Sequence, residues 1–529
     1  MRLSTRALVA LIGVCALAGC GGGGATAPRS PAVAAFIDLT PALPVSLDPA
    51  DEQGAAFDAL ETSLAGTLVR PVGGALGAAT LPPPTAVVGF LATSWHELAD
   101  GDYTFVLRRG VRSAYGHTLS GADVSFSFAR ELARSAFARF LARAGGISLR
   151  DPVSVLGGGR VRVNVTAPSP FTLAVLGNFR FGVLDSRAVA AHESAADPAA
   201  AGWLARHLAF YGPYELTSFE PGHELFAHAN PGFWRPLAFG DLAIEAVPSS
   251  SLRLSDLGAA SASHTAALSW SDFEVAARTA GLRASTVTSG AVSVLVPNER
   301  FRPFASIAVR RALSLAIDRE AIARDAFAGL APPAPLPAPA TLAAVAGTRG
   351  PLRARVALAR SLLAAAGYRH GFSVVLAASL ADSPQAPAEL AAIARQLGAI
   401  GVRVTVRYAA SADAVAAMMR EGAVDGALET QVTPVASAAF TILEQDVRGS
   451  PGDLGGYDSP ALDALAGALE TTAPAALAET RLVQARASVA ATFPAIALVE
   501  VPAQLVTRAA IGGYAAYAAP TVYYDQLHG

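Results

Sequence analysis

The segment from Trp95 to Phe128 constrains the fold more than any other part of this sequence. Asp100-Gly101 is a turn pair that supplies the positive φ of a tight hairpin, and residues 103–108 then alternate between two faces, one of them more apolar. Ser120 precedes Asp123 by three residues, ahead of an apolar run, which is a variant of the capping box that starts a helix. The segment therefore predicts a β-hairpin followed by a capped helix.

The first twenty residues have the pattern of a targeting segment rather than of folded structure. Arg2 and Arg6 precede an apolar stretch from Ala7 to Ala18, which is too short to span a bilayer as a helix. The stretch ends in L-A-G-C at Cys20, which resembles the lipobox of bacterial lipoproteins, in which the cysteine is lipidated; an ordinary secretory signal is the alternative. We expect residues 1–20 to be a signal peptide and residues 21–32, rich in Gly, Ala and Pro, to be a flexible tether.

Composition then limits what the remaining chain can do. The only cysteine besides Cys20 is Cys15, inside the targeting segment, so neither a disulfide framework nor a thiolate metal site is expected. The 529 residues are 52% hydrophobic and 16% charged, with a net charge of −2, which is enough apolar material for two or more domains or lobes. No basic stripe indicates nucleic-acid binding, and no apolar run after residue 20 predicts a membrane span.

The rest of the sequence predicts alternating strands and helices. Residues 57–70 have the apolar spacing of a helix, and residues 212–234 predict a second hairpin around a Pro-Gly turn. Residues 374–406 read as strand, helix and strand, the order of an α/β lobe with a mixed sheet. The segment from Pro494 to Gln504 is predicted to be a strand that returns to the first lobe.

Several of these blocks, in this order, resemble the family 5 solute-binding proteins, the extracytoplasmic receptors of peptide- and nickel-type ABC importers. The matching blocks are Trp95 with Asp100-Gly101, L-R-R-G-V at 107–111, A-D-V-S-F-S at 122–127, G-P-Y at 212–214 with N-P-x-F-W at 230–234, A-L-S-L-A-I-D-R at 312–319, S-L-L-A-A-A-G-Y at 361–368, the strand at 422–428 and G-Y-D-S-P-A-L-D at 456–463.

The resemblance implies an α/β fold of the two-lobed periplasmic-binding-protein type II class, with an additional domain in the first lobe. It divides the chain into a first lobe at 33–56, 209–296 and 502–529, an extra domain at 57–208 and a second lobe at 297–501. A cleft between lobes that closes on a ligand follows from this architecture.

The resemblance also implies a function. We expect the receptor of an ABC importer that captures a peptide-like or other organic solute, with peptide transport favoured, and delivers it to a membrane permease and its ATPase. The protein would be extracytoplasmic, in the periplasm or at the cell surface, held to the membrane by a lipid anchor, monomeric and without a cofactor. A sensory or envelope-interaction role on the same scaffold is the alternative, because the expected pocket residues are altered.

No enzyme constellation is present in the sequence. There is no HExxH, G-x-S-x-G, P-loop or G-x-G-x-x-G motif, and the nine histidines are scattered. We therefore expect neither catalysis nor a metal site.

The ligand-binding residues are expected where this sequence departs from its relatives. In many peptide-binding members of the family, the strand at this place leads into a Trp- and Asp-rich segment whose Asp binds the peptide ammonium. Here Gln431 stands for the Trp, and the acidic position falls near Pro434, so recognition of a free peptide N-terminus is in doubt. Candidate ligand contacts are Glu429, Thr430, Gln431 and Thr433; Glu429 either replaces the missing acid or is a strand-end surface charge.

Two further candidates come from outside this strand. Trp270 falls where the family's first lobe turns into the cleft, and it is either a wall of the ligand site or an ordinary core residue. Asn298 matches the family's strand-end Asn near the lobe crossover, and it either contacts the ligand or caps that turn.

Overall fold

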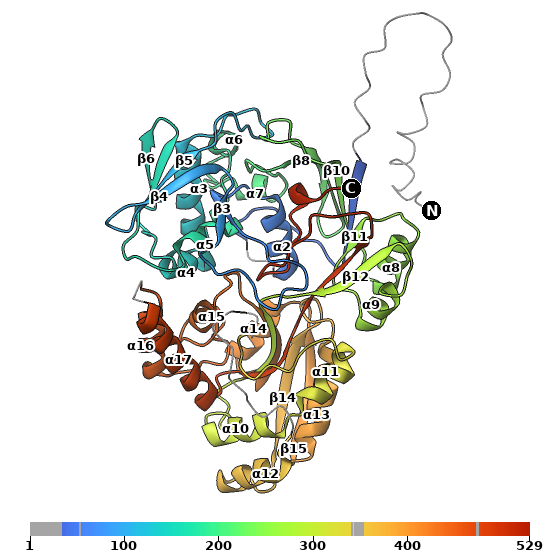
Figure 1. Cartoon of the computed structure of the whole chain (residues 1–529). Helices are drawn as coiled ribbons and strands as arrows, with labels where there is room; N and C mark the ends of the chain where they lie inside the picture. Colours follow the sequence, from blue (N-terminus) through green and yellow to red (C-terminus); the bar gives the residue numbers. More distant parts are fainter. Residues whose placement is uncertain (1–33, 52–53, 340–341, 343–353, 472–474) are drawn as a thin grey trace, which may run out of the picture.

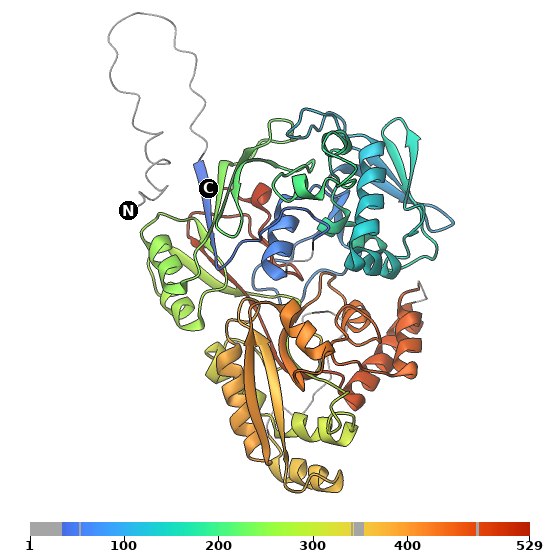
Figure 2. The ribbon, with the colours of Figure 1, turned by 180° about the vertical axis from the view of Figure 1, so that it is seen from behind.

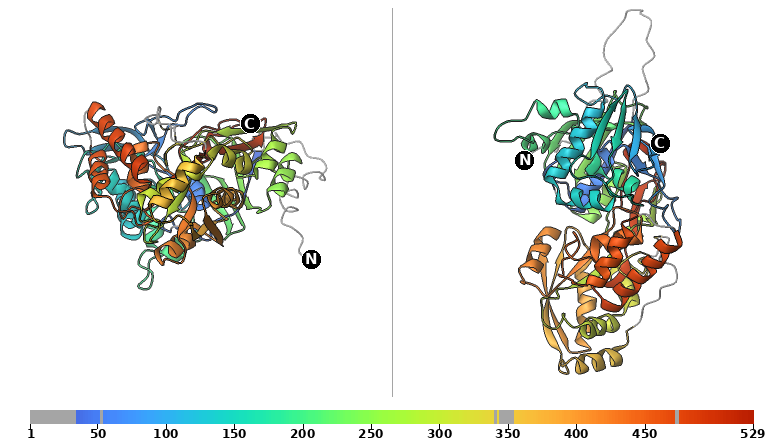
Figure 3. Two further views of the ribbon diagram at one scale, coloured as in Figure 1. Left: turned by 90° about the horizontal axis from the view of Figure 1, so that it is seen from below. Right: turned by 90° about the vertical axis from the view of Figure 1, so that its left-hand side faces the viewer.

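Two lobes lie one above the other in the computed structural model, which describes residues 34–51, 54–339, 342, 354–471 and 475–529 (Figure 1; Figure 3, right). Both termini of the described chain lie in the upper, first lobe. The second lobe is built from residues in the yellow to red part of the sequence.

The first lobe is organised around a sheet of seven described strands in the order β12-β18-β11-β1-β10-β9-β8. Strand β1 is parallel to β10 and β11, and the other pairs are antiparallel. The strands are β1 (Ala34–Thr40), β8 (Tyr214–Glu220), β9 (Glu224–Ala229), β10 (Phe239–Ala246), β11 (His264–Thr265), β12 (Leu282–Val287) and β18 (Ala503–Arg508). The predicted second hairpin is confirmed as β8 and β9, with Gly222 at φ 75° in its turn.

The second lobe has a mixed sheet in the order β15-β14-β16-β13-β17. Its strands are β13 (Ala291–Pro297), β14 (Phe372–Ser379), β15 (Val402–Ala409), β16 (Gly426–Val432) and β17 (Ile496–Glu500). Its helices are α10 (Ile307–Ala316), α11 (Arg319–Phe327), α12 (Val356–Ala365), α13 (Ala386–Gly398), α14 (Ala412–Arg420), α15 (Ala438–Gln445), α16 (Pro460–Leu469) and α17 (Ala475–Thr492). The predicted strand–helix–strand order is confirmed by β14, α13 and β15, with β14 and β15 parallel.

The extra domain contains a four-stranded sheet, β4-β5-β7-β6, and a two-stranded pair, β2-β3. Its strands are β2 (Val69–Pro71), β3 (Val87–Gly89), β4 (Ala92–Glu97), β5 (Tyr103–Leu107), β6 (Val153–Gly157) and β7 (Arg160–Val163), and its helices are α3 (Gly121–Arg134), α4 (Ala136–Ala144) and α5 (Thr172–Leu176).

The hairpin and capped helix predicted for residues 95–128 are confirmed. Strands β4 and β5 pair around a turn in which Gly101 has φ 89°. The Ser120 N–H and hydroxyl both donate to Asp123 Oδ2, at 2.8 and 2.7 Å, which completes the capping box of α3. Asp123 Oδ1 also accepts from the backbone and hydroxyl of Ser186, so one buried carboxylate fixes two helix starts.

The remaining elements belong to the first lobe. They are α2 (Ala55–Leu64), η1 (Phe179–Phe181), α6 (Ser186–Ala190), α7 (Ala201–Leu204), α8 (Ser250–Gly258), α9 (Trp270–Ala276) and η2 (Tyr524–Gln526). Helix α2 is shorter than the helix predicted for 57–70, because the chain leaves it after Leu64 and enters β2. Phe57, Leu60 and Leu64 pack with Phe36 and Leu242 of the first sheet, so α2 joins the first-lobe core rather than the extra domain.

Two segments cross between the lobes, and they correct the predicted boundaries. Strand β13 was assigned to the first lobe up to residue 296, but it pairs with β16 and β17 in the second sheet, so the first crossing is at residues 288–290. The segment from Pro494 to Gln504 was predicted as one strand; instead β17 ends at Glu500 in the second sheet and β18 begins at Ala503 in the first.

The lobes touch on both sides of these crossings. Helices α2 and α15 lie on one side and α9 and α11 on the other in opposite views (Figures 1 and 2). On the first side, the Phe440 ring of α15 meets the rings of Phe140 and Phe171 edge to face, with centroids 5.9 and 5.5 Å apart. The lobes are therefore closed against each other here. Within the described residues, no helix is both long and apolar enough to cross a membrane.

Candidate functional site

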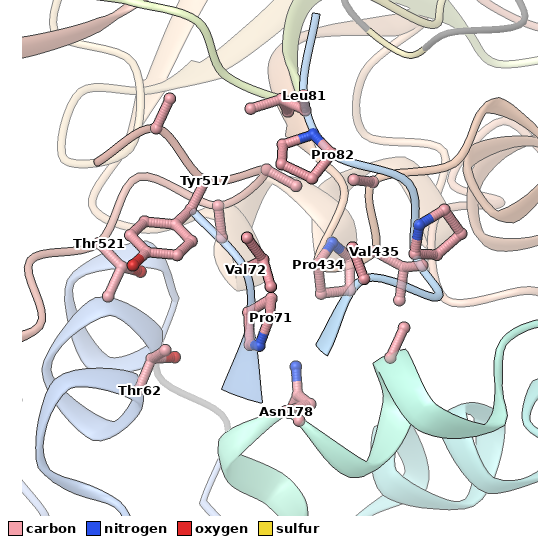
Figure 4. A pocket seen from close by; sticks show the side chains of 18 of the residues that line it. Thr62, Pro71, Val72, Leu81, Pro82, Asn178, Pro434, Val435, Tyr517 and Thr521 are labelled. Atoms are coloured by element: carbon pink, nitrogen blue, oxygen red, sulfur yellow. The ribbon is translucent and has the colours of Figure 1, made fainter. Parts of the chain in front are cut away.

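A cavity of about 70 Å³ lies where the two lobes and the extra domain meet (Figure 4). The first lobe and extra domain contribute the end of α2, the β2 and β3 region, the segment after α5 and the C-terminal segment, and the second lobe contributes Pro434, Val435 and Ala436. The remaining lining residues are Thr62, Pro71, Val72, Leu81, Pro82, Pro83, Pro84, Ala86, Ala174, Gly177, Asn178, Ala516, Tyr517, Ala518, Ala519, Thr521 and Tyr523.

The cavity wall is largely apolar and rich in proline, with a few polar groups. The Asn178 side chain accepts from the Arg180 N–H through Oδ1, and its nitrogen points toward Pro71 and Pro434 (Figure 4). The Thr521 hydroxyl is buried without a hydrogen-bond partner. Few directed polar groups in an apolar enclosure are typical of sites for small organic ligands.

The loop that forms the second-lobe side of the cavity is hydrogen-bonded to the crossing segment at residues 288–290. Thr433 donates its N–H to Gly290 O and its hydroxyl to Val435 O, at 3.3 and 2.9 Å. A Cβ at position 290 would lie 2.8 Å from Thr433 Cγ2, so glycine is required there for this close approach. The conformation of the loop at Pro434 therefore depends on the close contact of Thr433 with Gly290 in the crossing segment.

The predicted ligand residues of β16 lie next to the cavity but do not line it. Thr433 is buried and its hydroxyl is used within its own turn. The Thr430 hydroxyl is 3.0 Å from that of Ser383, and Gln431 is buried with its Oε1 unpartnered. The structure thus assigns the cavity contacts to Pro434, Val435 and Ala436, immediately after the predicted residues.

Glu429 is a half-buried carboxylate of β16 beside Val294 of β13. Burial raises the pKa of Glu429 to about 7, and the nearby Asp382 carboxylate raises it further. Its side chain has no hydrogen bond or ion pair with any described residue. A surface charge would not be desolvated in this way, so the alternative of a strand-end surface residue is not favoured.

Trp270 is the first residue of α9, a helix on the side of the crossing strands away from α2 and α15. Its ring contacts Phe273 of its own helix and Phe327 of α11, with centroids 5.5 and 5.8 Å apart. Trp270 is absent from the cavity lining. The structure therefore gives it the packing role, in a contact between the two lobes.

Asn298 has the turn-capping role rather than a place in the cavity. Its Nδ2 donates to the carbonyls of Met419 and Val424, and its Oδ1 accepts from the Arg300 N–H. Its side chain is buried, and it follows the end of β13 that is farther from the crossing at residue 290. Both polar atoms of its amide are engaged within this turn, which supports the capping role.

Cavity residues that sequence reasoning missed come from distant parts of the chain. Thr62 lies on α2 between Glu61 and Ser63 with no local signal of its own, and the run Pro82–Pro84 is the one local signal of a rigid wall. Cys20 lies outside the described residues. In the described part of the chain, no group of three or more His, Cys, Asp or Glu side chains is placed to hold a metal ion.

Comparison with protein families gives a match over most of the chain. Residues 86–442 match the model described as bacterial extracellular solute-binding proteins, family 5 middle. A curated relative, the glutathione-binding protein GsiB of Escherichia coli, is 26% identical over 331 residues, which is 60% of this chain and 60% of the relative. The chain thus aligns with somewhat less than two thirds of the length of that relative.

Solved structures agree with the model over nearly its whole length. The periplasmic binding protein DppA of Helicobacter pylori, in complex with the peptide STSA, has a TM-score of 0.82 at 20% identity, covering 93% of this chain and 98% of that one. NikA of Staphylococcus aureus, in complex with Ni(L-His)2, has a TM-score of 0.77 at 14% identity, covering 94% and 100%. These neighbours confirm the predicted two-lobed type II fold.

Proposed function

Because this chain belongs to family 5 of the bacterial extracellular solute-binding proteins, we propose that it is the receptor of an ABC importer. It captures a peptide-like or other organic solute between its lobes and delivers it to a membrane permease and its ATPase. The observation that carries this proposal is the cavity lined by both lobes beside the two crossing segments.

The geometry of the cavity supports reversible capture. In the described part of the chain two segments connect the lobes, so rotation about residues 288–290 and 501–502 opens the cavity without breaking either sheet. The enclosed space of about 70 Å³ is small beside the roughly 300–1,000 Å³ of ligand pockets in general. A peptide-sized solute would therefore be held in a less tightly closed arrangement than the one described.

The nature of the cavity wall supports a solute bound mainly through shape and a few hydrogen bonds. No acid occupies the position near Pro434 that takes the peptide ammonium in the relatives the sequence resembles. We therefore expect little difference in affinity between a free dipeptide and its N-acetylated form. Tight binding of free dipeptides together with a large loss on acetylation would contradict this part of the proposal.

The receptor role is tested by thermal unfolding of the chain lacking residues 1–20, against peptides, sugars and metal chelates. At least one solute class should raise Tm in a saturable way, and Pro434→Gly with Asn178→Ala should lower the affinity while leaving the unliganded Tm within a few degrees. Asn164, which is half-buried and does not line the cavity, provides a matched Asn→Ala control. No saturable shift with any solute would contradict the receptor role and favour the sensory or envelope-interaction alternative.

The lipid anchor is proposed from the sequence around Cys20 alone. In a bacterial host, the full chain should incorporate labelled palmitate and partition with membranes, and Cys20→Ser should abolish the label. Release of an unlabelled wild-type chain cleaved elsewhere would show an ordinary secretory signal instead.

A further inference from the structure

Helix α15 presents a carboxylate to the first lobe. Phe440 on this helix contacts Phe140 and Phe171 across the junction of the lobes, and Glu444 is one turn further along the same helix face. The Glu444 side chain is 4% exposed, and its Oε2 has no hydrogen-bond partner. Gln445 forms a hydrogen bond with this carboxylate, but its second oxygen is buried without a partner among the described residues. A buried oxygen of this kind is costly, so its position at a junction between moving parts calls for an explanation.

Helix α2 presents two more carboxylates from the opposite lobe. Asp58 and Glu61 are three residues apart and therefore share one face with Thr62, which lines the cavity. Glu61 is 0% exposed and neither of its carboxylate oxygens has a hydrogen-bond partner. The Asp58 side chain is half exposed, so the group has an opening to solvent.

The charge of Asp58 acts on both of the other two carboxylates. Burial raises the pKa of Glu444 to about 8 and that of Glu61 well above its usual value, and the Asp58 carboxylate contributes to both shifts. We call Asp58, Glu61 and Glu444 the junction carboxylates. Asp58 and Glu61 belong to α2 of the first lobe and Glu444 to α15 of the second, so the distance between the two helices depends on how far the lobes are closed.

The arginine side chains near the junction carboxylates form most of their hydrogen bonds and ion pairs with other groups. Arg180 donates to the carbonyls of Pro49 and Asp51 and contacts Glu131 at 3.4 Å, and it approaches Asp58 only to 3.9 Å. Arg130 and Arg134 both bind Asp48. In the described part of the chain, no cationic side chain forms an ion pair with Glu444 or Glu61.

We propose that the junction carboxylates form a subsite for an organic cation, a guanidinium or side-chain ammonium group of the transported solute rather than a free peptide N-terminus, which bridges α2 and α15 as the lobes close. This inference rests on the proposed receptor function and narrows its solute to one with a cationic group. A guanidinium or ammonium offers several donors to several carboxylates at once, which suits a site with unpartnered oxygens on two elements.

Binding at this subsite releases protons. At pH 7 Glu444 of the empty closed site is largely protonated, because its pKa is about 8, and burial shifts the pKa of Glu61 in the same direction. A cation favours the ionised carboxylates, so its affinity rises with pH up to about 8 and then levels off. The other charged groups around the site are Asp48, Asp51, Glu131, Arg130, Arg134 and Arg180.

The test uses methylguanidinium and methylammonium chloride as probes, so that it does not depend on the identity of the solute. Isothermal titration of the chain lacking residues 1–20 should show saturable millimolar binding, stronger at pH 8 than at pH 6, with proton release revealed by buffers of different ionisation heat. Glu444→Gln should weaken binding at least tenfold and remove most of the pH dependence. Asp58→Asn is the second variant if Glu444→Gln does not fold.

The controls separate this subsite from other sources of binding. Glu421→Gln, on an exposed carboxylate at the end of α14, should behave as the wild type. Sodium chloride at equal concentration should give no saturable heat, and calcium binding with higher affinity than either probe would overturn the assignment to an organic cation. Equal binding of the probes to wild type and Glu444→Gln would also overturn it.

The same variants distinguish the failure of this inference from failure of the receptor role. Arginine- and citrulline-containing dipeptides of otherwise equal sequence form a matched charged and neutral pair. If solutes raise Tm but charged and neutral members bind equally in wild type and Glu444→Gln, the receptor role stands and the cation subsite fails. If the methylguanidinium and methylammonium probes bind through Glu444 while no solute raises Tm, the subsite stands and the receptor role fails.

Discussion

The effect of a buried polar side chain on the stability of this protein depends on whether its polar atoms have hydrogen-bond partners. Asn298 uses both the oxygen and the nitrogen of its amide within the turn that follows β13. Asp446, at the end of α15, is equally buried, but neither of its carboxylate oxygens has a hydrogen-bond partner. The first residue stabilises the fold at every pH, whereas the second destabilises it when ionised.

Asn298→Ala should destabilise the protein without altering the ligand site. Two buried carbonyls and one N–H lose their partner, so the free energy of unfolding should fall by about 2–3 kcal/mol. Denaturant titration measures the loss, and isothermal titration with a bound solute should give an unchanged Kd. Asn298→Asp, which keeps the acceptor for the Arg300 N–H, should lose less stability than Asn298→Ala; a changed Kd in either variant would restore Asn298 as a ligand contact.

Asp446→Asn should flatten the pH dependence of stability. Burial raises the pKa of Asp446 to about 8, so the folded state holds a proton that the unfolded state has already lost near pH 4. Stability is therefore full below pH 4 and falls as pH rises through 8. Between pH 5 and pH 9 the wild type should lose on the order of 3 kcal/mol more than Asp446→Asn, measured by urea unfolding. Parallel pH profiles would show that Asp446 finds a partner in solution.

At the scale of single elements, the local signals in the sequence were reliable because they depend on neighbouring residues. The turn at Gly101 and the capping box at Ser120 and Asp123 each close hydrogen bonds within a few positions. Helix α2 shows the limit of such signals. Its apolar spacing continues to Leu68, but the chain becomes extended after Leu64, because β2 pairs with β3, whose paired residues lie 16 to 20 positions further along.

The capping box of α3 gives a prediction at this scale. Ser120→Ala should cost about 1 kcal/mol of stability, as for helix caps in general. Asp123→Ala should cost more, about 3 kcal/mol, because Asp123 also accepts from Ser186 at the start of α6. Asp413→Ala, on an exposed first-turn acid of α14, is the control. Urea unfolding measures all three; equal costs for Ser120→Ala and Asp123→Ala would mean that the Ser186 contacts add nothing.

At the scale of the whole molecule, the property that matters is the balance between open and closed lobes. On one side of the junction, the Phe440 ring packs edge to face against Phe140 and Phe171. On the other side, the Trp270 ring packs against Phe327. Both contacts join residues of different lobes. They therefore add to the stability of the closed arrangement and not to that of either lobe alone.

Phe440→Leu should shift the balance toward the open arrangement. It keeps an apolar side chain in the second lobe but loses two aromatic contacts, worth about 1–2 kcal/mol together. Solute affinity should fall roughly tenfold, and the unliganded radius of gyration from small-angle X-ray scattering should increase. Phe304→Leu, which removes aromatic contacts within the second lobe only, should lower stability without either effect. Unchanged affinity and radius in Phe440→Leu would show that these contacts do not hold the lobes.

The sequence by itself determined the family, the two-lobed fold and most local elements, because hairpins, caps and helix spacing are encoded in residues that are near one another along the chain. It also pointed to the segment after β16 as the place where this protein differs from its relatives, and Pro434–Ala436 of that segment line the cavity.

Only the tertiary structure decided which residues share the cavity and which carboxylates meet. Thr62, Asn178, Val435 and Thr521 are separated by up to several hundred positions in the chain, and their meeting depends on where the crossings at 288–290 and 501–502 place the lobes. The sequence likewise gave no sign that Glu61 and Glu444 are buried with carboxylate oxygens that have no partner among the described residues, since burial is set by how distant elements pack around each side chain. Local patterns specify elements, but proximity between distant elements depends on the complete packing of the chain.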